Sequence, residues 1–413
     1  MKVGMAKRAI AFPKGFFPTE GFSTQVDELH TRALLLEDGR RYMLISMEMT
    51  SLPPEEIAEL SDAARRASGA DECFVCVTHT FSAPHLLPDH LLVDAAARRN
   101  QETLKRLLRT AVTEAAGGAA AGLTEARLFL GVAQCGVNTA RDIETPDGWW
   151  VDACGGGPVD HRLTALRIDD AGGKTLGLLL HYPVQSSVLD GSQLREGGKA
   201  VSGDLAGVLC AKLEERFPNA TAMFLIGAAG DQAPVDKAVR RTVGGDGRIR
   251  VTDKQNGGVA LCRELGGQMA NAAAEAITGA RPMRSDTVGV RRAAVSVPAK
   301  KIERDLNKLH PTRIPPYEAD GQSTQVVELL TIGDLMLVGV KPELCCLTAL
   351  TICEGFPTAR VTTLFNGGAK YMADAASYDR ITYEAMNSPF GRGAAEKLAA
   401  AARGLLNGNQ PQI

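Results

Sequence analysis

Three pairs of short apolar runs, each joined by a tight turn, constrain the fold of this chain more than any other feature of its sequence. The paired runs are 32–37 with 42–47, 163–168 with 175–180, and 326–331 with 335–340. Asp and Gly occupy each turn, as in Asp38-Gly39, and such turns between apolar runs are typical of β-hairpins. We therefore expect antiparallel strand pairs in three separate parts of the chain.

Helical stretches lie between and after these hairpins. Their apolar residues recur at intervals of three and four positions, which is the spacing of one face of a helix. They cover residues 54–68, 95–116, 204–217, 259–278 and 394–406. Hairpins that alternate with helices favour an α/β fold with mixed sheets and helical cover over a purely parallel sheet.

No shift in composition marks a linker, so we expect residues 1–413 to form one domain. Two irregular segments are candidate substrate loops. Residues 235–258 are rich in Gly and in basic side chains, and residues 298–322 are polar and rich in proline. Solvated surface loops are the alternative interpretation of both segments.

Charge and cysteine content indicate the setting in which the chain works. A formal net charge of −2 gives no reason to expect a nucleic-acid partner. No apolar run reaches the roughly 18 residues that span a bilayer, so we expect no stable membrane association. Nine cysteines, an odd number, and a start without a secretory apolar stretch predict a reduced, cytoplasmic protein. The sequence makes no prediction of the oligomeric state.

The signatures of several enzyme classes are missing from the sequence, among them the G-x-S-x-G nucleophile elbow, the HExxH motif and a complete P-loop. What remains is a group of polar side chains at or just beyond the ends of apolar runs: His79, His181, Glu343 and Tyr371. The carboxyl ends of strands are where α/β folds place ligands, and these four side chains could close around one divalent cation. The alternatives are that His79 and His181 have structural roles, and that Glu343 stabilises a helix N-terminus through the helix dipole.

Several short motifs, taken in order along the chain, resemble the catalytic domain of the neutral/alkaline (non-lysosomal) ceramidase family. They are Thr78-His79-Thr80-Phe81-Ser82-Ala83-Pro84, Gly136–Arg141, His181-Tyr182-Pro183, Ser202-Gly203-Asp204, Gly227–Pro234, Pro342-Glu343 and Asn366–Glu384. The resemblance covers most of the chain and implies the fold of that domain. It also implies a Zn²⁺ ion held by His79, His181, Glu343 and Tyr371. The substrate-contacting Arg and second Tyr of the family fall on Arg141 and Tyr383.

One position departs from the family pattern. The first motif of the family usually has a second histidine, which lies beside the metal and helps to bind or polarise the substrate, and Phe81 takes its place here. His85, in the same loop, is the residue that we expect to compensate. A surface or helix-capping role is the alternative for His85.

The chemistry implied by the resemblance is zinc-dependent hydrolysis of a carbon–nitrogen amide bond by metal-activated water. We expect the substrate to be a small soluble N-acyl or cyclic amide, and Arg141, Tyr383 and His85 to act on it. The alternatives are a non-catalytic or ligand-binding relative, and a metal-assisted esterase or lyase on the same fold.

Overall fold

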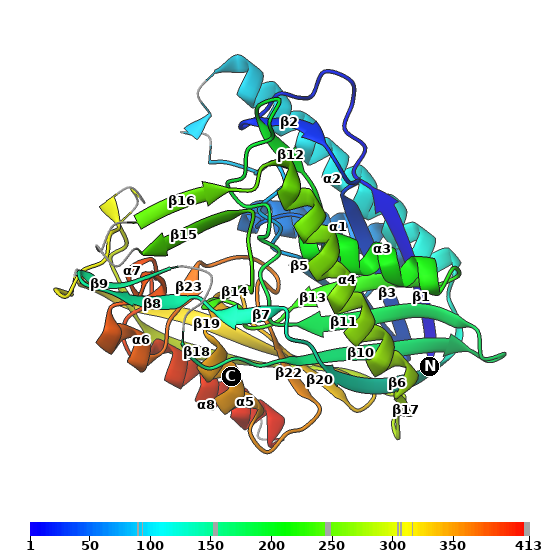
Figure 1. Ribbon diagram of the computed structural model, residues 1–413. Coiled ribbons are helices and arrows are strands. Elements are labelled where there is room, and N and C mark those ends of the chain that lie inside the picture. The colour runs from blue at the N-terminus through cyan, green and yellow to red at the C-terminus, as the bar shows by residue number, and fades with distance from the viewer. Residues whose placement is uncertain are drawn as a thin grey trace.

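The computed structural model describes residues 1–88, 91–92, 94–151, 156–243, 249–303, 305, 308–315 and 317–408. Two β-sheets lie face to face, and helices cover the outer face of each sheet (Figure 1). The layers therefore run helix, sheet, sheet, helix. The predicted α/β fold with mixed sheets and helical cover is confirmed.

The larger sheet contains both antiparallel and parallel strand pairs. Its main path, in spatial order, is β13 (Thr221–Ile226), β11 (Thr175–Tyr182), β10 (Arg162–Asp170), β6 (Thr124–Gln134), β1 (Lys2–Ala9), β3 (His30–Asp38), β4 (Arg40–Met47) and β5 (Glu72–Val77), and β17 (Arg281–Pro282) pairs with β6. The β3–β4 and β10–β11 pairs are antiparallel, which confirms two of the predicted hairpins. The edge strands β5 and β13 run parallel to their neighbours.

The smaller sheet has the order β18 (Val288–Lys300), β19 (Ala319–Ile332), β20 (Leu335–Gly339) and β22 (Ala359–Thr362). Its β19–β20 pair is the third predicted hairpin, and β20 and β22 run parallel. Short two-stranded pairs in the described residues are β2 (Phe22–Gln25) with β12 (Lys199–Val201), β7 (Asn138–Ala140) with β14 (Gln232–Pro234), β8 (Asp142–Thr145) with β9 (Gly148–Val151), β15 (Val239–Val243) with β16 (Ile249–Asp253), and β21 (Glu343–Leu344) with β23 (Tyr371–Met372).

The helices form the two outer layers. Helices α1 (Pro54–Ser68), α2 (Ala95–Ala121), α3 (Asp204–Arg216) and α4 (Asn256–Thr278) cover the larger sheet, and α5 (Cys346–Cys353) and α8 (Ala394–Leu406) cover the smaller one. Two short helices, α6 (Ala375–Arg380) and α7 (Tyr383–Met386), follow β23. All five predicted helices are present, and α1 and α8 have the predicted bounds.

The alternation of strand side chains sorts the apolar residues into three layers. On β3, Leu35 packs with the helices, whereas Leu34 packs between the two sheets. On β19, Leu330 faces the larger sheet and Leu329 packs in the cluster that contains α8. Each fully buried Leu contributes about 1.5–3 kcal/mol to the free energy of unfolding. The layer between the sheets therefore holds the two halves of the structure in one fixed arrangement.

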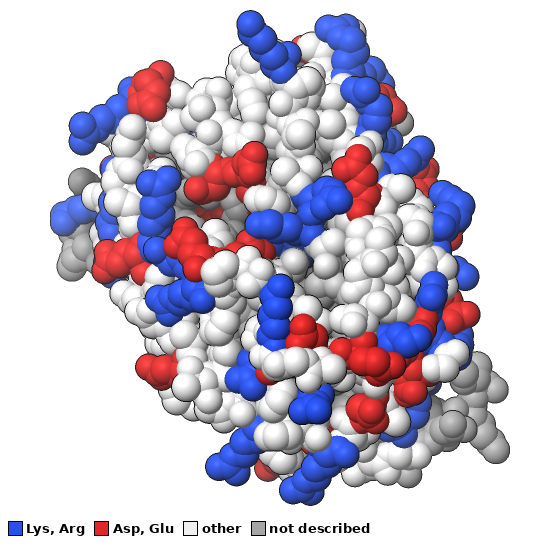
Figure 2. Space-filling model, turned by 90° about the vertical axis from the view of Figure 1, so that its right-hand side faces the viewer, with Lys and Arg blue, Asp and Glu red and all other residues white. Residues whose placement is uncertain are grey.

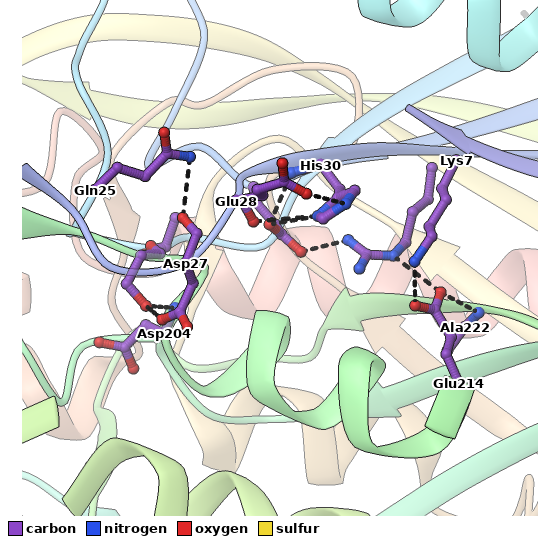
Figure 3. Close-up of polar contacts among 12 residues, drawn as sticks. Lys7, Gln25, Asp27, Glu28, His30, Asp204, Glu214 and Ala222 are labelled. Carbon is purple, nitrogen blue, oxygen red and sulfur yellow. Dashed lines mark hydrogen bonds and ion pairs between the residues drawn. The ribbon is translucent and has the colours of Figure 1, made fainter. Parts of the chain in front are cut away.

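A buried ion pair joins the start of β3 to the residue after β4. The guanidinium of Arg32 donates a hydrogen bond to the carboxylate of Glu48, and both side chains are almost fully buried. The same carboxylate accepts the backbone N–H of His30 at 2.8 Å, within a polar network that also contains Lys7 and Glu214 (Figure 3). Burial alone would raise the pKa of Glu48, but Arg32 and His30 together outweigh burial and lower that pKa.

Acidic and basic side chains are interspersed on the face of the molecule shown in Figure 2. This distribution agrees with the net charge of −2 and gives that face only a weak long-range field. Over the described ranges, no helix is both long enough and apolar enough to cross a membrane.

Glu48→Gln is expected to lower the free energy of unfolding by about 3–5 kcal/mol, because it leaves the Arg32 guanidinium buried without its counter-charge. Urea denaturation measures this loss. The matched control is Glu318→Gln, which breaks the ion pair between Lys301 and Glu318, whose side chains are 64% and 70% exposed. We expect this control to leave the urea midpoint unchanged. Equal effects of the two substitutions would contradict the role of the buried pair.

Candidate functional site

Four segments that follow strands of both sheets come together at one place. They are the segments after β5, β11, β20 and β22, and they carry His79, Gln185, Glu343 and Tyr371. Each of these four strands has a parallel partner, and the carboxyl ends of parallel strands point to the same edge of a sheet. The structure thus brings together three of the four predicted polar positions, His79, Glu343 and Tyr371.

His79 is held by two hydrogen bonds. Its Nδ1 donates to the backbone carbonyl of Thr50 at 2.8 Å, and its Nε2 lies 3.0 Å from Oε2 of Glu343. The backbone of His79 has a φ of +59°, in the left-handed region that non-glycine residues seldom adopt. Strain of this kind persists only where the surroundings fix it, and it clusters at functional sites.

Glu343 begins β21 and lies opposite Tyr371 of β23. Nε2 of Gln185 donates at 3.1 Å to Oε2 of Glu343, the atom that also contacts His79. Burial alone would raise the pKa of Glu343, but the neighbouring His79 and Arg141 outweigh burial and lower that pKa. The Glu343 carboxylate therefore stays ionised.

Arg141 is the cationic centre of the site. Its Nη1 donates to Oε1 of Gln185 at 2.9 Å, and its Nε and Nη2 donate to Oε1 of Glu384 at 2.9 and 2.6 Å. Its guanidinium carbon lies 5.4 Å from the ring centre of Tyr371 and 5.9 Å from that of Tyr383. Burial alone would lower the pKa of Arg141, but Tyr371 and Glu384 raise it well above its ordinary value. The guanidinium is therefore permanently charged.

Two carboxyl groups are buried beside Arg141. Oδ1 of Asp142 and Oε2 of Glu384 are both buried and have no hydrogen-bond partner among the described residues. Burial, together with the neighbouring Glu384, raises the pKa of Asp142 to about 10. One proton shared between the two carboxyl groups would satisfy both oxygens, which is the usual behaviour of carboxylates that occupy one site.

A cavity of about 160 Å³ is lined by Arg141 together with Gln185, Tyr371 and Tyr383. The candidate substrate loop 235–258 forms the β15–β16 hairpin and contributes three further residues to the wall: Lys237, Val239 and Arg241. Residues 244–248 of that loop lie outside the described residues.

The second candidate loop, 298–322, does not contribute to this cavity with any of its described residues. It connects β18 to β19, and Arg313 in it forms an ion pair with Glu144 of β8. Positions 304, 306, 307 and 316 lie outside the described part of the chain.

The structure does not bring His181 into the cluster. His181 is the penultimate residue of β11, and strand alternation points it to the same side as Leu179, between the two sheets. Its Nε2 donates to the backbone carbonyl of Val361 at 2.8 Å. Burial lowers the pKa of His181 to about 4, so the ring is neutral.

His85 does not line the cavity either, among the residues that the structure describes. Its Nδ1 lies 2.8 Å from a carboxylate oxygen of Glu20, and its Nε2 lies 3.2 Å from Oγ1 of Thr50. Phe81 does line the cavity, and its ring centre lies 4.7 Å from that of His79. The wall next to His79 is therefore apolar, and His85 does not supply a polar group there.

Comparison with solved structures finds ceramidases. A neutral ceramidase from Pseudomonas aeruginosa aligns with a TM-score of 0.74 over 100% of this chain and 75% of its own length, at 15% sequence identity. A ceramidase in complex with C2 aligns with a TM-score of 0.72 over 100% of this chain and 76% of its own length, at 16% identity. This chain has the neutral ceramidase fold. No family model and no curated protein sequence matches the chain.

The zinc ion that the resemblance implies needs several donors arranged around one point. In this neutral ceramidase fold His79 and Glu343 meet, but the further donor that reaches Glu343 from the β11 segment is the carboxamide of Gln185. In the described part of the chain, no group of three or more His, Cys, Asp or Glu side chains is placed to hold a metal ion. The residues present therefore do not fit the predicted ligand set of His79, His181, Glu343 and Tyr371.

Sequence patterns do not point to Gln185, Asp142 or Glu384. A glutamine beyond a strand end has no chemical signature, and the contact between Asp142 and Glu384 joins segments that are far apart in the chain. The only indication in the sequence is that each acid directly follows a predicted site residue: Asp142 follows Arg141, and Glu384 follows Tyr383.

Asp142→Asn is expected to change the pH dependence of stability. An unfolded Asp loses its proton near 3.8, whereas folding raises the pKa of Asp142 to about 10. The folded state therefore binds more protons between these values, and this group makes the free energy of unfolding fall as the pH rises. Asn cannot ionise, so the variant should gain stability relative to wild type from pH 5 to 9, by up to about 1.4 kcal/mol per pH unit. Urea denaturation at several pH values measures the free energy of unfolding of both proteins. If the two free energies change with pH in parallel, the shared proton is wrong.

Proposed function

We propose that this protein hydrolyses the carbon–nitrogen bond of a small amide bound in the cavity beside Arg141. The convergence of Arg141, Tyr371 and Tyr383 on one cavity, with the buried His79–Glu343 pair in contact with its wall, supports this most. Two solved structures with the same fold are ceramidases, and these are hydrolases of an amide bond.

Three hydrogen-bond donors are available for the carbonyl oxygen of the amide. Hydrolysis passes through a tetrahedral intermediate whose oxygen is negatively charged, and positioned donors stabilise it. Burial raises the pKa of both Tyr371 and Tyr383, so the two phenols keep their protons at neutral pH. Arg141 adds a permanent positive charge. Removing one such donor typically lowers kcat by about 10²–10³-fold.

The His79–Glu343 pair is the proton-transfer group of this proposal. Water adds to the carbonyl carbon and gives one proton to Glu343, and the imidazolium of His79 gives one proton to the leaving nitrogen as the C–N bond breaks. Transfer of a proton from Glu343 to His79 across their 3.0 Å contact restores the pair. The carbonyl of Thr50, which accepts from Nδ1, holds the ring in one orientation.

The cavity favours a small substrate with a negative charge. Its volume of about 160 Å³ is below the roughly 300–1,000 Å³ of pockets for drug-sized ligands. Lys237 and Arg241 line it in addition to Arg141, against a single acid, Asp190. An N-acyl or cyclic amide that carries a carboxylate suits both the size and the charge of this cavity.

A second candidate function is binding of such a ligand without hydrolysis, and Phe81 is the observation that favours it. Its ring packs against His79 and lines the cavity, whereas neither His79 nor Glu343 does so within the described residues. In this alternative the cavity residues bind the ligand, and the His79–Glu343 pair stabilises the wall.

Turnover of a panel of N-acyl amino acids and cyclic amides tests the proposal. His79→Ala and Glu343→Gln are expected to lower kcat by at least about 10²-fold, the usual contribution of a proton-transfer group. His181→Ala is the matched control, because His181 lies outside the cluster, and it should retain the wild-type kcat. Saturable binding by the wild-type protein without any turnover would replace hydrolysis by the second candidate.

Lys237→Ala is expected to raise KM for a carboxylate-bearing amide about tenfold or more, with kcat little changed. One hydrogen bond to a charged group contributes about 1.5–3 kcal/mol, and about 1.4 kcal/mol corresponds to a factor of ten. Lys174→Ala, in the exposed β10–β11 turn, is the control. If Lys237→Ala affects a neutral amide and a carboxylate-bearing amide equally, the charge preference is wrong.

A further inference from the structure

We infer that this site balances its buried charges without a resident metal ion, and that Gln185, which bridges Arg141 and Glu343, occupies the place of a metal donor. The inference concerns the same cavity as the proposed hydrolysis. It rests on the contacts of Gln185 and its neighbours, however, and it holds whether or not the protein turns over an amide.

Both ends of the Gln185 carboxamide are already bonded within the protein. Its Oε1 accepts from Nη1 of Arg141 at 2.9 Å, and its Nε2 donates to Glu343 at 3.1 Å. Arg141 can only donate, so its bond to Oε1 fixes which way the amide points. The group that faces Glu343 is therefore an N–H donor, which cannot bind a metal ion.

The polar atoms around the His79–Glu343 contact satisfy one another. Side chains that ligate a metal direct nitrogen and oxygen atoms at the ion. Without the ion, such buried atoms would lack a hydrogen-bond partner. Among the described residues, no side-chain atom of His79, Gln185, Glu343 or Arg141 belongs to the buried atoms that lack a partner. Nδ1 of His181 does lack one, and it lies on the far side of β11, in the layer between the sheets.

The positive charge near Glu343 comes from the protein. The guanidinium of Arg141 stays charged at any pH at which the protein is folded. It donates a hydrogen bond to Gln185, which in turn donates one to Glu343. Gln185 therefore links the carboxylate of Glu343 to a permanent positive charge through hydrogen bonds within the protein.

Metal content is the direct test. Wild-type protein, produced with added zinc and dialysed without a chelator, is expected to hold far less than one zinc per chain by mass spectrometry of the metal. Gln185→His replaces the amide with an imidazole beside His79 and Glu343, and the zinc content is expected to rise to about one per chain. Zinc affinity, from competition with a chromophoric chelator, should increase by more than about 100-fold, since changes around the ligands alone alter it by about 10–100-fold.

Two further substitutions in the Gln185→His background serve as matched controls. His79→Ala removes a ligand of the new site and should abolish the gain in zinc, whereas His181→Ala should keep it. Circular dichroism and thermal unfolding show whether each variant is folded. Because metal content is measured without turnover, failure of the proposed hydrolysis would leave these results unchanged.

Two results would overturn the inference. One is stoichiometric zinc in the wild-type protein that is lost on His79→Ala. The other is a folded Gln185→His variant that gains no zinc. If Gln185→His does not fold, the comparison of the wild-type protein with His79→Ala decides alone.

Discussion

The packing of the two sheets against each other is the interaction on which the rest of the structure depends. Residues such as Leu34 and Leu330 fill the layer between the sheets and set the position of one sheet relative to the other. This arrangement brings the segments after β5 and β11 next to those after β20 and β22, although the two groups belong to different sheets. His181, inside the layer, is neutral, whereas Glu343 and Arg141, just beyond strand ends, carry charge.

Arg141 connects two acidic groups that would otherwise be costly to bury. On one side it reaches Glu343 through Gln185, and on the other it bonds Glu384 directly. Asp142 keeps a proton next to Glu384, so this second pair carries about one negative charge rather than two. The cavity wall therefore combines a permanent cation with a group whose charge depends on one shared proton.

The sequence was sufficient to predict the local elements and most of the members of the site. Apolar runs with Asp-Gly turns specify hairpins through local chemistry, and the three- and four-residue spacing specifies the helices, so α1 and α8 were predicted with their observed bounds. His181 lies outside the cluster because one residue decides which face of a strand a side chain occupies: β11 ends at Tyr182, and His181 points into the core. Gln185 could not be identified, because its role comes from partners that only the packed sheets bring close.

The carboxamide of Gln185 also has a genetic consequence. Glutamine and histidine share the first two bases of their codons and differ only in the third, so one base change converts residue 185 from an amide that bridges Arg141 and Glu343 into an imidazole beside His79. The site described here and the metal-binding version of it that we infer are therefore separated by a single base.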